Sequence, residues 1–214
     1  MSLDPSALPD LPATQRRARA LAMVEAIVCP DWQDRFYSYN SRWGPNVEMA
    51  SMRNGSGDDW FLLFGPFGAG IKGLAHESEV AGDAVLLQTA RASIPVAFQS
   101  FLNEPAFSWN CMSFCYWRRP DDDGWIRVVH PDASRAAMED GSSEFLALLH
   151  TPATAYVEFA EWYYEVSLPV SSVEAIFGHA PLTSVLVQSI NPELSLAEVV
   201  ADAQEIGYPV SSDA

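Results

Sequence analysis

The sequence predicts an α+β fold: an antiparallel β meander and a hairpin in the N-terminal two-thirds of the chain, packed with a C-terminal helical region. Two observations lead to this prediction. Short strand-like segments follow one another up to residue 129, separated by turn sequences such as "SRWGPN" and "NGSGD"; such close spacing favours antiparallel pairing over βαβ units. From residue 142 onwards, the apolar residues recur at helical spacing instead. We therefore expect strands first and helices second.

The length of 214 residues suffices for one sizeable core and is short for two ordinary domains. Residues 1–13 contain three prolines and are expected to form a flexible tail. Residues 14–214 are expected to form a single α+β domain. Its first part, 14–135, would hold a helix and the sheet, and its second part, 136–214, would be acidic and helical.

The first helix is expected to run from a cap at Thr14 to Val28, because Pro30 prevents its continuation. A short helix and loop are expected in "IPVAFQSFLNEPAF", where Phe98 and Phe101 have helical spacing. Other segments are rich in aromatic and β-branched residues or alternate in polarity, which predicts strands. The predicted strands are 34–39, 46–53, 59–64, 111–118 and 124–129.

The acidic half begins with "SSEFLALLH" and a helix that starts after Pro152. Two S-x-x-E sequences, at Ser171 and Ser195, have the spacing of a capping box, in which the serine and the glutamate bond to each other's backbone amides. They predict helix starts in the last third of the chain. The expected helices there are 172–178, 182–190 and 196–205.

The net charge is −16, and the charge is unevenly distributed. Residues 136–214 carry twelve carboxylates and no Lys or Arg. Such a field repels nucleic acid and anionic lipid, so neither is expected as a partner, and it attracts cationic proteins. The simpler alternative is that the excess charge only keeps the protein dispersed.

The three cysteines, Cys29, Cys111 and Cys115, are too few for a disulfide framework and fit a reducing compartment. They also lack the partners of a zinc site, so we expect no metal and no cofactor. No apolar run approaches the ~18 residues of a membrane span. In the segment 16–28, Glu25 interrupts the apolar core that a secretion signal would need. A cytoplasmic location is therefore expected.

The stretch "GPFGAGIKGLAHES" contains G-x-G-x-x-G and the single lysine of the chain, Lys72. It fits no phosphate-binding motif: no packed helix opens at its third glycine, and no Ser or Thr follows the lysine. We predict a glycine-rich hairpin instead, with a positive φ at one or more of Gly68, Gly70 and Gly73. Replacing Lys72 by Ala is then expected to leave stability nearly unchanged.

Polar residues gather beside the predicted turns of this region and are the candidates for a binding site, because turns expose side chains. They are Arg53, Asn54, Asp58, Asp59, Lys72, His76 and Glu77. A second candidate is an acidic docking face, where Glu158, Glu161 and Glu165 share one side of a predicted helix with Trp162 nearby; a merely solvated face is the alternative. No residue is assigned a catalytic role.

Several phrases together resemble an uncharacterised family of bacterial proteins of about this length. They are "SYNSRW", "MASMRNGSGD", "GPFGAGIKGLAHES", "FCYWR" and "EIGYP", within residues 35–209. The resemblance implies a bacterial origin and transfers no catalytic residue. In size, acidity and lack of catalytic motifs, the chain is also similar in general type to immunity proteins, which neutralise secreted toxins.

These features favour a non-enzymatic binding protein, such as a toxin-neutralising immunity protein whose partner is a cationic toxin. Carboxylates would speed the encounter, and buried aromatic residues would supply affinity. The alternative is an enzyme or a small-ligand-binding module that uses the Arg53–Glu77 region. A pocket enclosing Lys72, His76 and Asp58 would favour this alternative.

Overall fold

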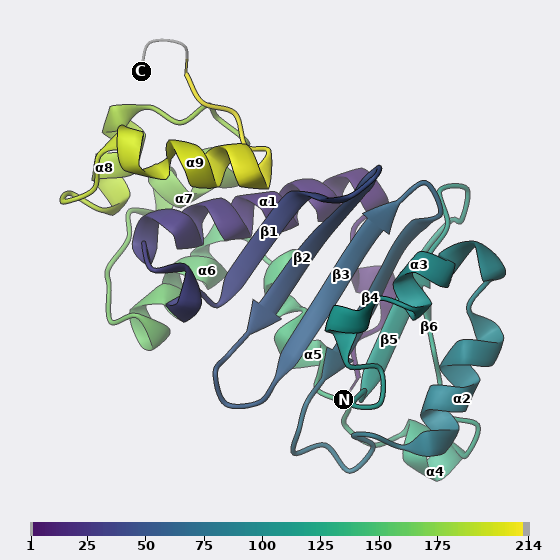
Figure 1. The fold of residues 1–214 in the computed structure, drawn as a ribbon. Coiled ribbons are helices and arrows are strands. Elements are labelled where there is room, and N and C mark those ends of the chain that lie inside the picture. Colours follow the sequence, from purple (N-terminus) through teal and green to yellow (C-terminus); the bar gives the residue numbers. More distant parts are fainter. Residues whose placement is uncertain (1, 212–214) are drawn as a thin grey trace.

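The turn-separated segments of the first part of the chain form one antiparallel sheet in the computed structural model, which describes residues 2–211 (Figure 1). Each strand pairs with the next one along the chain. The predicted α+β class and the antiparallel meander are confirmed. In sequence and in sheet order, the strands are β1 (Tyr37–Gly44), β2 (Val47–Arg53), β3 (Asp59–Gly65), β4 (Gly68–Leu74), β5 (Phe114–Arg118) and β6 (Ile126–Arg127).

Strand β4 is the largest difference from the predicted strands, because the glycine-rich stretch is itself the second arm of a hairpin and not only its turn. Gly68 has a φ of 114°, so the predicted positive φ is confirmed there. Gly73 lies within the strand, where an added Cβ would stand 1.9 Å from Cζ of Phe114. Glycine is a poor strand former on its own. The close approach of neighbouring side chains explains why it is present here.

Helix α1 (Leu11–Val28) begins four residues earlier than predicted, because Asp10 and not Thr14 caps it. The Asp10 carboxylate accepts a hydrogen bond from the amide of Ala13, and the Thr14 hydroxyl donates to the Pro9 carbonyl from inside the helix. The end at Val28 is as predicted.

Residues 2–10, expected to be part of a flexible tail, are packed against the domain in the structure. Leu3 and Leu8 are buried. The Leu3 amide donates to the Ser142 hydroxyl, and the Trp125 indole donates to the Pro9 carbonyl. Apolar burial and these two hydrogen bonds hold the segment across the far strands of the sheet.

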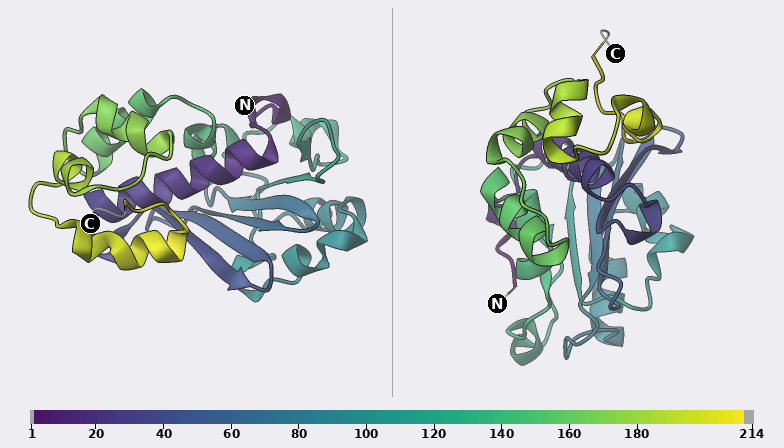
Figure 2. Two further views of the ribbon diagram at one scale, coloured as in Figure 1. Left: turned by 90° about the horizontal axis from the view of Figure 1, so that it is seen from above. Right: turned by 90° about the vertical axis from the view of Figure 1, so that its left-hand side faces the viewer.

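Helices cover both faces of the sheet (Figure 2). One face packs against α1 and the C-terminal helices and forms the larger core. The other face is covered by α2 (Ala84–Ser93) and α3 (Gln99–Leu102), which bury a second, smaller core over β3 to β5. Helix α2 was not predicted; Asp83 caps it by accepting hydrogen bonds from the amides of Val85 and Leu86.

The last third of the described chain is helical, as predicted. The capping box at Ser195 is present at the start of α9, whereas the one at Ser171 is absent because α7 already begins at Val170. The remaining helices are α4 (Ala133–Ala136), α5 (Ser142–Phe145), α6 (Ala153–Tyr163), α7 (Val170–Phe177), α8 (Ser184–Ile190) and α9 (Leu196–Ile206). Short 3-10 helices lie at Pro5–Ala7, Trp32–Asp34, Val96–Phe98, Pro105–Phe107 and Ala147–Leu149.

Arginines of the part before residue 136 neutralise part of the acidic part, 136–214. Arg35 pairs with Asp202 on α9 at 2.7 Å, and Arg127 pairs with Asp140 at 2.9 Å. Both arginines therefore tie the helical region to the sheet. Between residues 2 and 211, no helix has the length and apolar content needed to cross a bilayer.

Candidate functional site

The sheet separates the seven candidate binding residues into two groups, because neighbouring residues of a strand point to opposite faces. Asp58 and Asp59 are adjacent in sequence, yet Asp58 bonds to His76 and Asp59 pairs with Lys72. Lys72, Arg53 and Asp59 all belong to the face of the sheet that carries Cys115 and the smaller core. The candidates therefore do not form one site.

Lys72 is buried, which corrects the expectation that a turn would expose it. Its side chain has 0% exposure, and Nζ lies 3.1 Å from Oδ1 of Asp59 and 5.7 Å from the ring centroid of Phe61. Burial raises the pKa of Asp59 against the opposing effect of the ammonium group. The premise behind a harmless Lys72→Ala substitution is thus wrong. Arg53 is also engaged, with its guanidinium 4.5 Å from the ring centroid of Trp32.

Asn54, Asp58 and His76 lie together at the other side of the same sheet end. The Asn54 side-chain amide donates to Oδ2 of Asp58 at 2.6 Å, and its oxygen accepts from the amides of Ser56 and Asp58. Oδ1 of Asp58 accepts from the His76 amide and lies 2.8 Å from Nδ1 of the ring. This contact raises the pKa of His76 and lowers that of Asp58. The β2–β3 loop and the end of β4 are thereby fixed to each other.

A cavity of about 660 Å³ opens beside this cluster, and we call it the acidic cavity. It encloses His76 and Asp58 but not Lys72. No Lys or Arg lines it. Arginines of the described residues pair with carboxylates outside this cavity. Its carboxylates are Asp58, Glu77, Glu79, Glu139 and Glu144.

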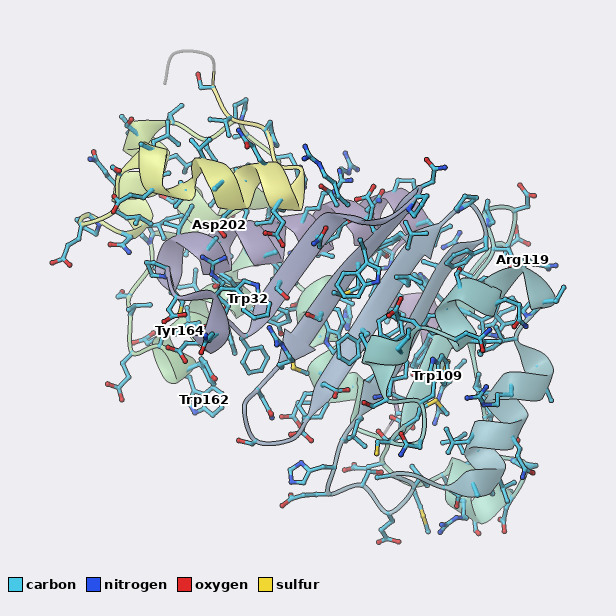
Figure 3. The ribbon with its side chains drawn as sticks, in the orientation of Figure 1. Trp32, Trp109, Arg119, Trp162, Tyr164 and Asp202 are labelled. Atoms are coloured by element: carbon cyan, nitrogen blue, oxygen red, sulfur yellow. The ribbon has the colours of Figure 1, made fainter. Side chains whose placement is uncertain are left out.

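A second cavity of about 210 Å³ adjoins the first and shares Glu144 and Phe145 with it. We call it the aromatic cavity. It lies between the β2–β3 loop, the α5 region and α6, and it too is lined by no Lys or Arg. Trp162 stands at its edge, 76% exposed, at the periphery of the molecule (Figure 3). Its rings belong to Phe36, Tyr37, Phe145, Phe159, Trp162 and Tyr163.

Glu25 lies directly behind the wall of the aromatic cavity and is fully buried. Oε1 accepts a hydrogen bond from the Tyr156 hydroxyl at 2.7 Å. Oε2 accepts from the Tyr164 hydroxyl at 2.5 Å and from the amides of Phe36 and Tyr37 at 2.9 and 3.4 Å. No Lys, Arg or His among residues 2–211 pairs with it. A buried carboxylate with only neutral donors is unusual, because burial disfavours charge.

In the sequence, Glu25 stands out only as an interruption of an apolar segment. That interruption was the available signal: a single carboxylate within "ALAMVEAIV" must either end the helix or find donors in the core. The donors come from residues 36, 37, 156 and 164. Nothing in the local sequence could identify them.

The buried carboxyl of Glu25 gives a prediction about pH. Burial raises its pKa above the ordinary 4.5. A raised folded-state value means that its stabilising effect is complete below about pH 4.5 and is lost as the pH rises through the folded-state pKa. The unfolding free energy of wild type minus that of Glu25→Gln should therefore fall as the pH rises above 4.5, by at most about 1.4 kcal/mol per pH unit. Urea unfolding at several pH values measures it.

Glu198→Gln is the control for this pH series. Hydrogen bonds from Ser195 lower the pKa of Glu198, so its stabilising effect is lost as the pH falls. The stability difference between wild type and this variant should change with pH in the opposite direction. Parallel curves for wild type and Glu25→Gln would show that Glu25 titrates normally.

The proposed docking face on α6 is only partly a helical face. Glu158, Glu161 and Trp162 are exposed on the helix. The helix ends at Tyr163, and Glu165 follows it with a φ of 56°, so the third carboxylate does not continue the row. Neither Glu158, Glu161 nor Glu165 lines a cavity described above.

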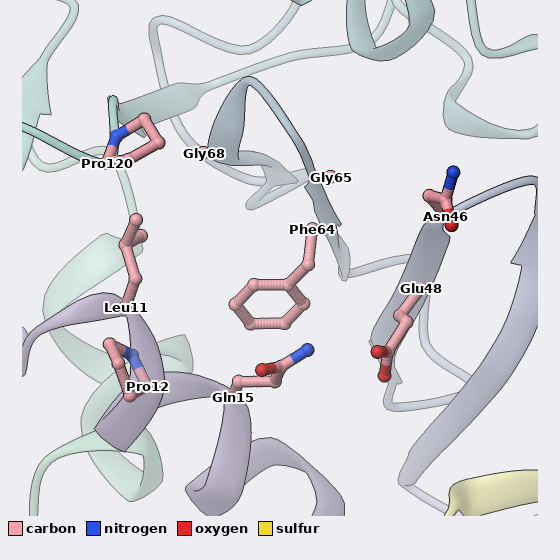
Figure 4. A pocket seen from close by; sticks show the side chains of 9 residues that line it. All are labelled: Leu11, Pro12, Gln15, Asn46, Glu48, Phe64, Gly65, Gly68 and Pro120. Carbon is pink, nitrogen blue, oxygen red and sulfur yellow. The ribbon is translucent and has the colours of Figure 1, made fainter.

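A further cavity, of about 280 Å³, lies at the opposite end of the sheet (Figure 4). It is bounded by the start of α1 and the β3–β4 turn, and Gln15 and Phe64 project into it. Its carboxylate, Glu48, is occupied: Tyr39 donates to it and Arg19 pairs with it. The carboxylate that lines the cavity at this end of the sheet is therefore already engaged.

Among residues 2–211, no three His, Cys, Asp or Glu side chains are grouped so that they could hold a metal ion. Comparisons of the chain with protein-family models, with curated proteins and with solved structures found no match. The resemblance to a bacterial family stays a prediction, and the function has to be inferred from the geometry of the site.

Proposed function

We propose that this protein is a non-enzymatic, cytoplasmic binding protein that docks a cationic partner protein in the acidic and aromatic cavities. A toxin-neutralising immunity protein, whose partner is a basic toxin, is its most concrete form. The observation that carries the proposal is the pair of adjoining cavities: carboxylates line one, aromatic rings line the other, and neither is lined by a Lys or Arg.

The two cavities would supply different parts of the binding energy. Carboxylates that are exposed, such as Glu77 at 90%, stay hydrated and act mainly on the rate of encounter with a basic surface. Aromatic residues at the centre of an interface supply most of the affinity once water is excluded. Trp162, 76% exposed in the free protein, is a large apolar side chain available for such contact.

The alternative function, an enzyme or small-ligand module in the Arg53–Glu77 region, has weaker support. Its candidate residues are divided between two faces of the sheet, and Lys72 is buried in an ion pair. The His76–Asp58 pair could orient an imidazole for proton transfer. Yet the same contact fixes the β2–β3 loop to the end of β4 and is explained by that role alone.

Two triple variants test where a cationic partner docks. The first neutralises the cavities (Glu77→Gln, Glu79→Gln and Glu144→Gln); the second neutralises the α6 face (Glu158→Gln, Glu161→Gln and Glu165→Gln). Each removes three exposed negative charges, so long-range attraction falls equally. The probe is a fluorescent, lysine-rich dodecapeptide that contains one central arginine. We expect the first variant to weaken binding about tenfold at 0.15 M salt and the second less than about threefold.

The measurement is fluorescence anisotropy over a salt series, with unfolding curves to show that both variants remain folded. Equal losses in the two variants would mean that the peptide responds only to total charge, and the proposal would be wrong. A larger loss in the second variant would place the docking surface on α6, as an alternative that the sequence already suggested.

A further inference from the structure

We propose that the aromatic cavity receives the side chain of one arginine of the partner protein, with its guanidinium group against the rings of Phe159 and Tyr163. This inference rests on the proposed function and specifies which chemical group of the partner is recognised. It is carried by the ring geometry, by the exposed carboxylate of Glu144 in front of the rings, and by the small number of other polar groups in the cavity.

Two rings of the lining, one helical turn apart on α6, lie parallel to each other. Phe159 and Tyr163 are stacked with a centroid separation of 5.4 Å and an interplanar angle of 13°. Phe36 meets both of them edge-on, at 4.8 and 4.9 Å. This edge contact holds the pair in place and restricts its rotation. A guanidinium group stacks on such faces and is attracted by their negative quadrupole.

Carboxyl groups lie on both sides of this wall of the cavity. Phe36 and Tyr37 line the cavity, and the backbone amides of the same two residues donate to Oε2 of Glu25. Glu25 is therefore separated from the cavity by the thickness of one residue. On the solvent side, the exposed Glu144 carboxylate can accept two parallel hydrogen bonds from an arginine.

The lining favours arginine over lysine or a metal ion. Apart from Glu144 and the polar atoms of its Tyr and Trp rings, its polar side chains are Asn54 and Ser56. Both ends of the Asn54 amide are already used, by Asp58 and by the Ser56 and Asp58 amides. Too few oxygens remain for a divalent cation, which takes six or more. A lysine ammonium would lose its strong hydration for little return, whereas guanidinium is weakly hydrated.

The test uses three forms of the dodecapeptide that differ only in the central residue. Arginine to lysine keeps the charge, and arginine to citrulline keeps the shape but removes the charge. For wild type, we expect the lysine peptide to bind about fivefold and the citrulline peptide about tenfold more weakly than the arginine peptide. Trp162→Ala combined with Glu144→Gln should reduce both differences to less than about twofold.

The matched control is Glu161→Gln, which removes an exposed charge next to Trp162 without altering the lining of the cavity. It should keep the preference for arginine. NMR spectra can locate the arginine side chain of the peptide directly. If it lies against the rings, the ring-proton signals of Phe159 and Tyr163 should shift with the arginine peptide and not with the citrulline peptide. Free N-acetyl-arginine amide is added separately and should bind far more weakly than the peptide.

The outcomes separate this inference from the proposed function. One outcome is that the three peptides bind equally while the Glu77, Glu79 and Glu144 substitutions still weaken binding. This result would overturn the arginine site and leave the proposed docking of a cationic partner intact. Binding of none of the peptides would overturn both. Binding of N-acetyl-arginine amide as tight as that of the peptide would instead identify a small-molecule site and contradict a protein source.

Discussion

Replacing Asp59 by Asn should destabilise the protein by about 3–5 kcal/mol, because it leaves a fully buried ammonium group without its counter-charge. Lys72 has 0% side-chain exposure, whereas Asp59 keeps 25%. The reverse substitution, Lys72→Met, should cost less, about 1–2 kcal/mol, because water can still reach the Asp59 carboxylate. Urea unfolding at pH 7, followed by circular dichroism, measures both values.

The double variant is the control for this pair. With Lys72→Met and Asp59→Asn together, no charge remains buried, so the double variant should be more stable than Asp59→Asn alone. A buried pair can often be replaced by uncharged groups at little cost, while removing one partner is expensive. Additive losses in the double variant would show that the two side chains do not interact in solution.

Gly68→Ala and Gly73→Ala should each destabilise the protein by about 2–4 kcal/mol, because both glycines are required by the packing of β4. At Gly68, φ is 114° and a Cβ would lie 2.0 Å from the backbone oxygen of Arg118. At Gly73, a Cβ would lie 1.9 Å from Cζ of Phe114, which is itself buried. Unfolding curves test the size of each effect.

Gly124→Ala is the matched control, since nothing lies within 4 Å of its Cβ position and its φ is not in the left-handed region. Its stability should stay within about 0.5 kcal/mol of wild type. If Gly68→Ala and Gly73→Ala behaved like Gly124→Ala, the glycines would have a different purpose, and ligand binding at this stretch would have to be considered again.

Local periodicity was sufficient to predict most elements. The turn sequences "SRWGPN" and "NGSGD" separate β1, β2 and β3, and helical spacing of apolar residues marks α6 and α9. These signals are local, since a strand or helix shows its buried side as a repeat of two or of 3.6 residues. Two elements were missed: β4 is glycine-rich and lacks such a repeat, whereas α2 was overlooked although Leu86 and Ala90 have helical spacing.

The candidate site was predictable only in part. The sequence placed Asn54, Asp58, His76 and Glu77 near turns, and the structure brings them to one end of the sheet. The sequence could not show that Lys72 is buried. A strand is central only when other strands pair with both of its edges, and its own residues do not reveal those partners. Nor could the sequence relate Glu25 to Tyr156, which is 131 positions away in the chain.

The sequence by itself determined the α+β class, the antiparallel pairing of the strands and the acidic helical half, because turn chemistry, periodicity and charge are properties of short segments. Only the tertiary structure decided which side chains meet. Strand alternation sends Asp58 and Asp59 to opposite faces, and α6 packs beside the β2–β3 loop to form the aromatic cavity over Glu25. Such contacts depend on how distant elements pack, and burial then sets the charge and exposure of each group.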